Sequence, residues 1–254
     1  MSERRIGLDA PTQGETTAFY DRLTRGEESR GWWGVESRFD ADKIVRSRSV
    51  ARAFRARLRP ELTPDMRVLD VGCGPGGFLA VLAELSGEVV GVDISEQFVS
   101  LARATIARHG LANASAEIAS SDSLPCADGA FHAVVLVDVI HHLERIGPTL
   151  DEVCRVLRPG GRLLIFEPNK LNPLLGLMCA LDRNEWGLLR LGSKRKYRQL
   201  LRSRFDIEHV GYSELLIGPD SRLFTSVAAW IASEPTARLL GWLSPKIFVS
   251  ARRR

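Results

Sequence analysis

A glycine-rich turn between a strand and a helix constrains the fold of this chain more than any other feature. The segment VLDVGCGPGG (residues 68–77) runs from an apolar, strand-forming stretch into a turn with four glycines, and a helical pattern follows. Glycine allows tight turning and close approach of the backbone to a ligand, while the start of a helix offers unpaired N–H groups. The pattern therefore predicts an α/β protein with a ligand site at this turn.

A carboxylate follows the turn at the distance expected of a ribose-binding residue. Asp93 ends the next apolar stretch, 21 positions after Gly72. At the end of the second strand of a βαβ unit, a carboxylate can accept hydrogen bonds from both hydroxyls of a ribose. The glycines also satisfy the G-x-G-x-x-G pattern, so an NAD(P)-dependent oxidoreductase remains an alternative. No lysine followed by serine or threonine completes the loop, which argues against a nucleotide triphosphate P-loop.

Strand and helix patterns alternate along the middle of the chain. Ser95 is expected to cap a helix that runs to about Arg108 and stops at Gly110. Strands are expected at residues 67–71, 88–92, 116–119, 131–137, 162–166, 205–212 and 246–250. The alternation predicts a doubly wound, Rossmann-like sheet of about seven strands, mostly parallel with an antiparallel last strand, plus N-terminal helices and an inserted helical cap.

Length and composition predict one domain with additions at the site. The 254 residues, 44% apolar and 26% charged, fit one substantial globular domain or one domain with a cap. We expect residues 1–60 to form a helical segment that covers the site and residues 61–254 to form the main domain. Within it, residues 168–204 and 218–243, here named the cap segments, are expected to form a cap over the site.

The charge balance and the cysteines narrow the range of partners. Much of the net charge of +4 comes from the C-terminal arginines and a basic helix at 194–204, so it does not predict a nucleic-acid partner. Solvated charges on an amphipathic helix explain that segment, and contact with RNA or an anionic membrane surface is the alternative. Four cysteines without a C-x-x-C pair predict neither a bound metal nor a disulfide framework.

The apolar runs of the chain are short. Those at 171–181 and 223–232 fall below the ~20 residues needed to span a bilayer, and residues 1–15 lack the apolar core of a secretory signal. These features predict a soluble, cytoplasmic protein without a transmembrane segment. They do not indicate its oligomeric state.

The glycine segment carries a family resemblance. VLDVGCGPGG resembles motif I of the class I S-adenosylmethionine-dependent methyltransferases, because Asp70 precedes the loop in D-V-G-C-G-P-G. Three later segments match counterparts in that family: GVDIS (91–95), SDSLP (121–125) and RVLRPGGRLLI (155–165). The resemblance covers about residues 64–170. It implies S-adenosylmethionine as cofactor and S-adenosylhomocysteine as product, and it argues against the oxidoreductase.

The resemblance also implies where the cofactor would lie. The glycine turn would hold the methionine portion, Asp93 the ribose, and the segment after the third strand the adenine. Asp70 would orient the turn or reach the methionine ammonium. Tyr20 would fold over the cofactor, with ordinary packing as the alternative. The full set of candidate cofactor residues is Tyr20, Asp70, Gly72, Cys73, Gly74, Gly76, Asp93, Ile94, Ser121, Asp122, Ser123, Val137 and Asp138.

Several of these residues have simpler roles as alternatives. Asp122 could cap a turn, and Asp138 could cap the helix after the fourth strand. Trp32 and Trp33 could line the mouth of an acceptor site or anchor a surface loop. Each alternative is a local structural role that needs no ligand.

Candidate catalytic residues follow the fourth and fifth strands, because ligands of doubly wound sheets lie beyond the carboxyl ends of the strands. One of His141 and His142 could remove a proton from the acceptor, with His141 slightly favoured; the alternative is that one packs and the other is solvated. Glu167 could orient an acceptor or cap a turn. The chain lacks the Asn/Asp-Pro-Pro-Tyr/Phe tetrad of many methyltransferases that act on base amines.

The apolar content of the cap segments indicates the kind of acceptor. Leucine, tryptophan, isoleucine and phenylalanine in these segments predict a small, partly apolar or lipid-linked molecule, methylated on a hydroxyl or carboxyl rather than on a nucleic-acid base. An ordinary helical cap is the simpler explanation of the same residues. A non-catalytic protein that binds S-adenosylmethionine also remains an alternative.

Overall fold

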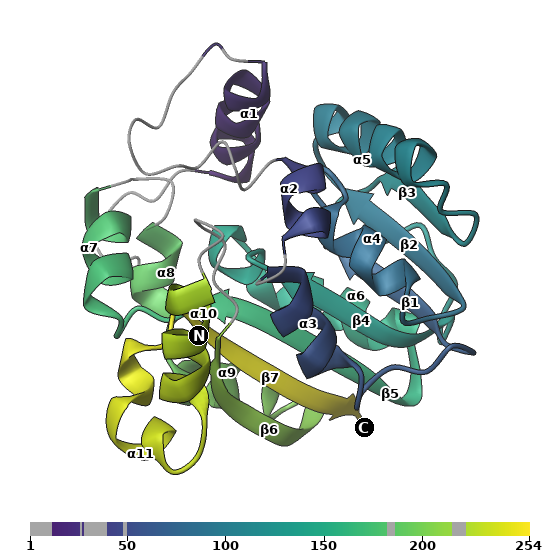
Figure 1. The fold of residues 1–254 in the computed structure, drawn as a ribbon. Coiled ribbons are helices and arrows are strands. Elements are labelled where there is room, and N and C mark those ends of the chain that lie inside the picture. Colours follow the sequence, from purple (N-terminus) through teal and green to yellow (C-terminus); the bar gives the residue numbers. More distant parts are fainter. Residues whose placement is uncertain (1–11, 26, 28–39, 48–49, 182–185, 215–221) are drawn as a thin grey trace.

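The computed structural model describes residues 12–25, 27, 40–47, 50–181, 186–214 and 222–254. Seven strands form one sheet in the order β3-β2-β1-β4-β5-β7-β6 (Figure 1). Their bounds are β1 (Arg67–Val71), β2 (Glu88–Asp93), β3 (Ala114–Ile118), β4 (Phe131–Val137), β5 (Leu157–Pro168), β6 (Phe205–Ser213) and β7 (Lys246–Arg253). Strands β1 to β5 are parallel, and β7 runs antiparallel between β5 and β6. The mostly parallel sheet with an antiparallel last strand is confirmed.

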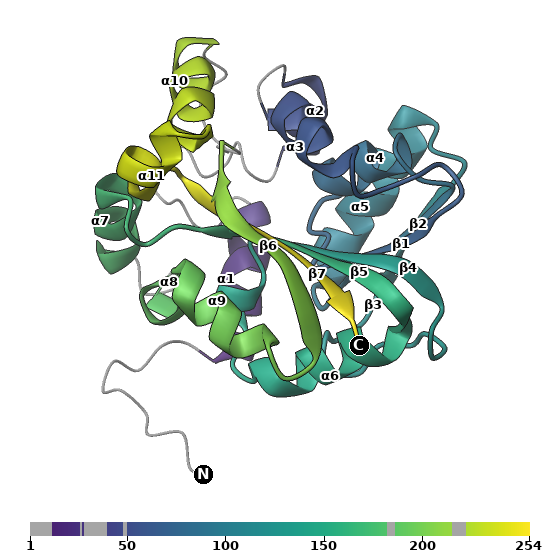
Figure 2. The ribbon, with the colours of Figure 1, turned by 90° about the horizontal axis from the view of Figure 1, so that it is seen from below.

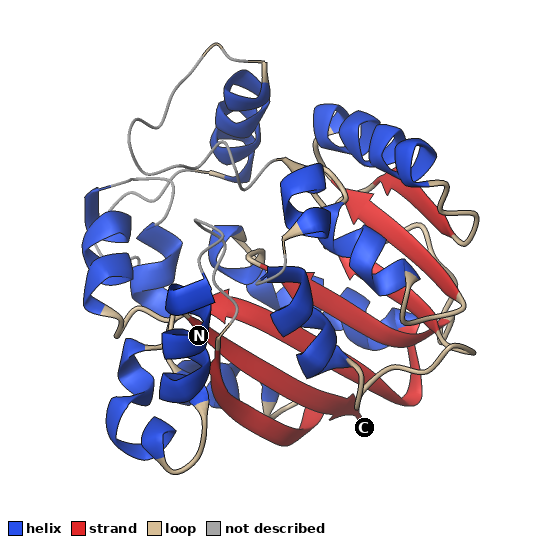
Figure 3. Ribbon diagram, viewed as in Figure 1, coloured by secondary structure: helices blue, strands red, loops and turns tan. Residues whose placement is uncertain are grey.

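Helices cover both faces of the sheet (Figure 3). On one face lie α2 (Ala41–Arg46), α3 (Val50–Leu58), α4 (Gly77–Ala83) and α5 (Glu96–His109). On the other lie α6 (Ile146–Val156), α8 (Trp186–Leu191) and α9 (Lys194–Leu201). Successive side chains of a strand point to opposite faces of the sheet. Val68 therefore packs against the helices of the first face and Leu69 against those of the second. Both are fully buried, which explains the continuously apolar strands.

Most element boundaries agree with the sequence prediction. Ser95 caps α5 by accepting a hydrogen bond from the N–H of Phe98 (3.1 Å), and Gly110 ends the helix in the left-handed region. The third strand begins at Ala114, two residues before the prediction, because this half-exposed edge strand has little apolar pattern. Strand β5 begins at Leu157, which pairs with Phe131 before the chain bulges outward. The basic helix α9 ends at Leu201 rather than 204.

The cap segments contain helices near the side of the sheet formed by β6 and β7 (Figure 2), and two of them, α8 and α9, also cover the second face. The full set is α7 (Pro173–Leu181), α8, α9, α10 (Arg222–Ala232), α11 (Thr236–Leu240) and the 3₁₀ turn η5 (Gly241–Leu243). Asn169 joins the two segments by donating from Nδ2 to the carbonyls of Trp242 and Ser244, at 3.0 Å each. Within the described ranges, no helix is long and apolar enough to cross a membrane.

Candidate functional site

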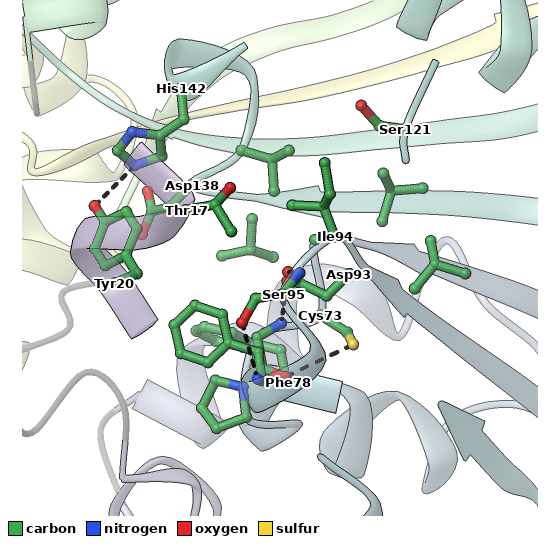
Figure 4. A pocket seen from close by; sticks show the side chains of 18 of the residues that line it. Thr17, Tyr20, Cys73, Phe78, Asp93, Ile94, Ser95, Ser121, Asp138 and His142 are labelled. Carbon is green, nitrogen blue, oxygen red and sulfur yellow. Dashed lines mark hydrogen bonds between the residues drawn. The ribbon is translucent and has the colours of Figure 1, made fainter. Parts of the chain in front are cut away.

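A cavity opens beyond the carboxyl ends of β1, β2 and β4, where a ligand is expected in this fold (Figure 4). The glycine turn and the start of α5 form one wall. The 3₁₀ turn η3 (Ile140–His142) forms another wall, and α1 (Gln13–Thr24) lies across the opening. The predicted site residues that line the cavity are Tyr20, Gly72, Cys73, Gly74, Asp93, Ile94, Ser121, Val137, Asp138, His141 and His142.

Asp93 fastens the glycine turn to the next helix. Its Oδ2 accepts from the N–H of Gly74 and its Oδ1 from the N–H of Ser95, both at 3.0 Å. Burial raises the pKa of Asp93, and the backbone N–H bonds counteract that rise. Each carboxylate oxygen can accept a second hydrogen bond, so both remain able to receive a ligand hydroxyl.

Asp70 is buried behind the turn rather than in the cavity lining. Its side chain is 1% exposed, and its Oδ2 has no hydrogen-bond partner among the described residues. Burial, followed by the negative charge of Asp93, raises the pKa of Asp70 to about 7. A nearby positive charge would favour its ionised form.

The residues around the cavity fit S-adenosylmethionine. The backbone of Gly74 has a left-handed conformation, and a Cβ built there would meet no atom within 4 Å, so the space beside it is open. Ile94 keeps an apolar side chain 43% exposed next to Asp93, where a flat ring can rest. The carboxylates of Asp93 on the cavity wall and of Asp70 behind the turn complement a ligand with a sulfonium and an ammonium group.

Five predicted site residues lie outside the cavity lining: Asp70, Gly76, Asp122, Ser123 and Glu167. Asp122 accepts a hydrogen bond from the hydroxyl of Ser120 (2.6 Å) in the turn after β3. Ser121 from the same turn does reach the cavity, and its hydroxyl lies 3.0 Å from that of Thr149. Trp32 and Trp33 lie outside the described residues.

Helix α1 is attached to both sides of the opening. The hydroxyl of Tyr20 lies 3.3 Å from Nε2 of His142, and the two rings meet edge to face, as Figure 4 shows. On the other side, Ser95 donates from its hydroxyl to Asp21. Thr17, Tyr20 and the more distant Ile44 of α2 line the cavity, although the sequence suggested only Tyr20. Their contribution depends on how α1 and α2 pack, which no local motif encodes.

His141 and Glu167 form a buried pair beside the cavity. Nδ1 of His141 lies 2.6 Å from Oε2 of Glu167, and their side chains are 1% and 0% exposed. Oε1 of Glu167 accepts from the N–H groups of Val139 (2.8 Å) and Ile140 (2.7 Å), so the carboxylate holds the whole turn η3. With Nδ1 donating to Glu167, Nε2 of His141 is the ring nitrogen that can accept a proton.

Lys246 is a site residue that the sequence did not reveal. It is 5% exposed at the start of β7, and its Nζ pairs with Oδ1 of Asp138 on the cavity wall. Asp138 has a φ of 59°, a rare value for a residue with a side chain, and its N–H donates to the carbonyl of Phe166 (2.9 Å). The pair depends on the antiparallel pairing that places Lys246 opposite Pro168.

The cap contacts the histidine turn directly. A Cβ added at Gly187 of α8 would lie 1.6 Å from the carbonyl oxygen of His141, so only glycine allows this approach. Arg190 of the same helix donates to the carbonyl of Leu143 (3.3 Å), and α7 packs against α8. The cap therefore reaches the cavity wall next to His141.

In the described part of the chain, no group of three or more His, Cys, Asp or Glu side chains is arranged to hold a metal ion. The expectation that the protein uses no metal remains a prediction. The described cysteines Cys73, Cys126 and Cys154 are free thiols. Burial raises the pKa of Cys73, which lines the cavity, so its thiol is held in the neutral form.

A family model described as a methyltransferase domain matches residues 62–204. The O-methyltransferase cnsE of Penicillium expansum is 31% identical over 175 residues, which are 65% of this chain and 62% of that protein. The ubiquinone/menaquinone biosynthesis C-methyltransferase UbiE of Rhizobium etli is 30% identical over 189 residues, 69% of this chain and 72% of that protein. The chain matches only 35% and 42% of the lengths of two further curated relatives.

Solved structures share the fold at low sequence identity. The [4+2]-cyclase SpnF superimposes with a TM-score of 0.64 at 18% identity, over 96% of this chain and 97% of that chain. At this identity the likeness concerns the fold alone. A protein with this architecture can therefore carry a reaction name other than methyl transfer.

Proposed function

The chain belongs to the class I S-adenosylmethionine-dependent methyltransferases, and from that premise we propose that it methylates a small, partly apolar acceptor on a hydroxyl or carboxyl group. The observation that carries the proposal is the His141–Glu167 pair beside the cavity of the glycine turn. It places a group able to take up a proton next to the cofactor site. S-adenosylmethionine, when bound, supplies the electrophilic methyl group.

The proposed chemistry uses the pair as a base and its orienting partner. Glu167 holds His141 with the proton on Nδ1, so Nε2 would accept the proton of an acceptor hydroxyl as that oxygen is methylated. The bound cofactor would supply the methyl group with sulfur as the leaving group, so the product would be S-adenosylhomocysteine. Burial of His141 and Glu167 excludes water from the proton transfer, and an acceptor held in line gains a large entropic advantage. For a carboxylate acceptor, His141 would position rather than deprotonate.

We assign the cofactor contacts by chemistry. Both carboxylate oxygens of Asp93 would accept hydrogen bonds from the ribose hydroxyls. The open space beside the backbone of Gly74 would hold the amino-acid portion of the cofactor. Ile94 and Ser121 would border the adenine, with Asp122 acting through the turn that positions Ser121. Tyr20 and Thr17 would close over the ligand from α1.

The apolar acceptor is supported by the cap and by the relatives. Helix α8 packs on the backbone of His141, so the cap reaches the turn that carries the proposed base. One relative is named for a quinone pathway and another as an O-methyltransferase. A base such as His141 suits oxygen as the acceptor atom, because a hydroxyl must lose its proton during transfer.

Calorimetry with S-adenosylhomocysteine, NAD and NADP tests the cofactor, and labelled methyl transfer into cell extracts, followed by mass spectrometry, tests the reaction. We expect heat with S-adenosylhomocysteine alone and label in an apolar molecule. Binding without any transfer would favour a non-catalytic protein or another reaction on this fold. Heat with NAD or NADP instead would favour the alternative that the protein is an oxidoreductase.

A further inference from the structure

Large apolar side chains are exposed in one part of the molecule. Among the described residues, eleven large apolar side chains are exposed, and nine of them lie between residues 171 and 242. These nine, here named the apolar face, are Leu171, Leu174, Leu177, Leu181, Leu223, Val227, Trp230, Leu239 and Trp242. Single exposed leucines are ordinary, but a concentration of this kind marks an interaction surface.

The exposed residues form stripes on their helices. Leu174, Leu177 and Leu181 of α7 recur every three to four positions and are 57–68% exposed, so one side of α7 is apolar and turned outward. Leu223, Val227 and Trp230 repeat this spacing on α10. A helix stripe normally faces the core, and these two face solvent. In Figure 2, α7, α10 and α11 lie together at one end of the sheet.

Basic residues lie beside the apolar face. Residues 168–204 contain nine lysines and arginines against two acidic residues, while the whole chain has a net charge of only +4. The start of α9 and the turn η5 both contact the ring of Tyr212. Nζ of Lys194 lies 3.9 Å from the ring centroid. A Cβ added to Gly241 of η5 would lie 2.2 Å from a carbon of the same ring. Arg195 and Lys196 follow Lys194 and are exposed.

We propose that the apolar face and the basic start of α9 dock the protein on an anionic lipid surface. Leucine and tryptophan side chains would enter the boundary between headgroups and acyl chains, while lysine and arginine contact the anionic headgroups. A second copy of the chain is a poorer occupant, because a two-fold contact through this face would oppose the basic residues of one copy to those of the other. Docking in this way would bring the membrane to within one helix, α8, of the turn that carries His141.

Sedimentation of the full chain with lipid vesicles tests the proposal. The protein should bind vesicles that contain phosphatidylglycerol and bind pure phosphatidylcholine weakly. Leu177→Ser and Trp230→Ser should each lower the partition coefficient at least about tenfold, the factor expected when one large apolar side chain no longer leaves water. The matched control is Ile118→Ser, which changes an apolar side chain that is 50% exposed on edge strand β3, at the other end of the sheet.

The charge component has its own variants. Arg195→Glu with Lys196→Glu should reduce binding to phosphatidylglycerol vesicles by roughly fivefold or more per charge, whereas Arg52→Glu with Arg59→Glu, both exposed near α3, should not. Added salt should weaken binding. Calorimetry with S-adenosylhomocysteine shows that each variant is folded.

Three results would overturn the proposal. One is native protein that binds S-adenosylhomocysteine but no anionic vesicle. Another is vesicle binding that survives all the cap variants. The third is a dimer, seen by light scattering, that the apolar variants dissolve while vesicles fail to bind, which would assign the face to a second copy. None of these outcomes depends on whether methyl transfer occurs.

Discussion

The half of the molecule around the glycine turn and the half that forms the cap use opposite arrangements of charge and apolar surface. Around the turn, carboxylates are buried and apolar side chains are packed away; Asp70 is 1% exposed, and Ile94, the exposed exception there, lines the cavity. In the cap segments, the apolar face and cations such as Arg195 and Lys196 are exposed. The first arrangement encloses a polar, positively charged ligand. The second presents a surface to something larger.

This difference matches the two tasks in the proposed function. The proposed cofactor contacts come from the turn and its carboxylates, and the acceptor is assigned to the cap side of the cavity. The two halves are in contact at the cavity, because α8 packs on His141 and Lys246 of β7 pairs with Asp138. The following predictions test where the two halves remain distinct.

The largest effect is expected where the halves meet at the proposed base. His141→Ala should lower the transfer rate about 10²- to 10⁴-fold, because the proton acceptor is lost. Glu167→Gln should lower the rate similarly, since an amide N–H facing Nδ1 imposes the wrong tautomer. Both should keep S-adenosylhomocysteine affinity within about twofold, as calorimetry can show, because neither is assigned a cofactor contact.

His142→Ala is the matched control for the base. It should weaken S-adenosylhomocysteine binding more than it changes the rate, because His142 contacts Tyr20 of α1. If His142→Ala removes transfer and His141→Ala does not, the assignment of the base is wrong. The rates require the acceptor that the labelled screen identifies.

Lys246→Met tests whether β7 belongs functionally to the cofactor half. Removing one partner of a buried ion pair costs about 3 kcal/mol of unfolding free energy, because the other charge stays in a poorly solvated place. The exposed pair of Lys43 with Asp40 gives the control, and Lys43→Met should change stability by less than about 1 kcal/mol. Urea unfolding measures both. Equal small effects would show that Asp138 does not depend on Lys246.

Asp70→Asn tests the buried carboxylate through pH. The pKa of Asp70 is raised to about 7 in the folded chain from an unfolded value near 4, so the folded state holds the extra proton between those values. The ionised Asp70 carboxylate destabilises the folded chain because it is buried. This loss of unfolding free energy is absent below about pH 4, grows as pH rises, and is complete above about pH 7. Asp70→Asn should therefore exceed the native chain in stability by roughly 4 kcal/mol at about pH 8 and match it near pH 4.

The same variant should lose affinity for S-adenosylhomocysteine if Asp70 attracts the ammonium group. Asp206→Asn, at a side chain 68% exposed, is the control and should change stability by less than about 0.5 kcal/mol. A stability difference for Asp70→Asn that does not vary with pH would contradict the raised pKa.

The smallest effect compares one helix cap from each half. Ser95 caps α5 and Ser193 caps α9, each accepting a backbone N–H three residues on. Either Ser→Ala change should lower the unfolding free energy by about 1 kcal/mol. Only Ser95→Ala should also weaken cofactor binding, because Ser95 donates to Asp21 of α1. Equal losses of cofactor affinity would show that α1 does not close the site.

Local spacing was enough to predict the strands, the glycine turn and Asp93 in the cofactor half, but not the cavity residues Thr17 and Ile44. The strands at 67–71 and 131–137, the cap at Ser95 and the stop at Gly110 all follow from signals within a few residues. The turn and Asp93 were also found this way, because the fixed length of a βαβ unit brings them together. Asp122 shows the limit: its neighbour Ser121 reaches the cavity, and one position decides which side chain does so.

The sequence by itself thus determined the sheet, the glycine turn and the carboxylate that holds it, since these depend on periodicity and short covalent distances. Tertiary structure alone decided that Glu167 meets His141 across 26 positions and that Lys246 meets Asp138 across 108. Those pairs require parallel register between β4 and β5 and an antiparallel β7 inserted beside β5. Tertiary structure also decided that the apolar stripes of α7 and α10 face outward, because an apolar stripe does not specify which neighbour it meets.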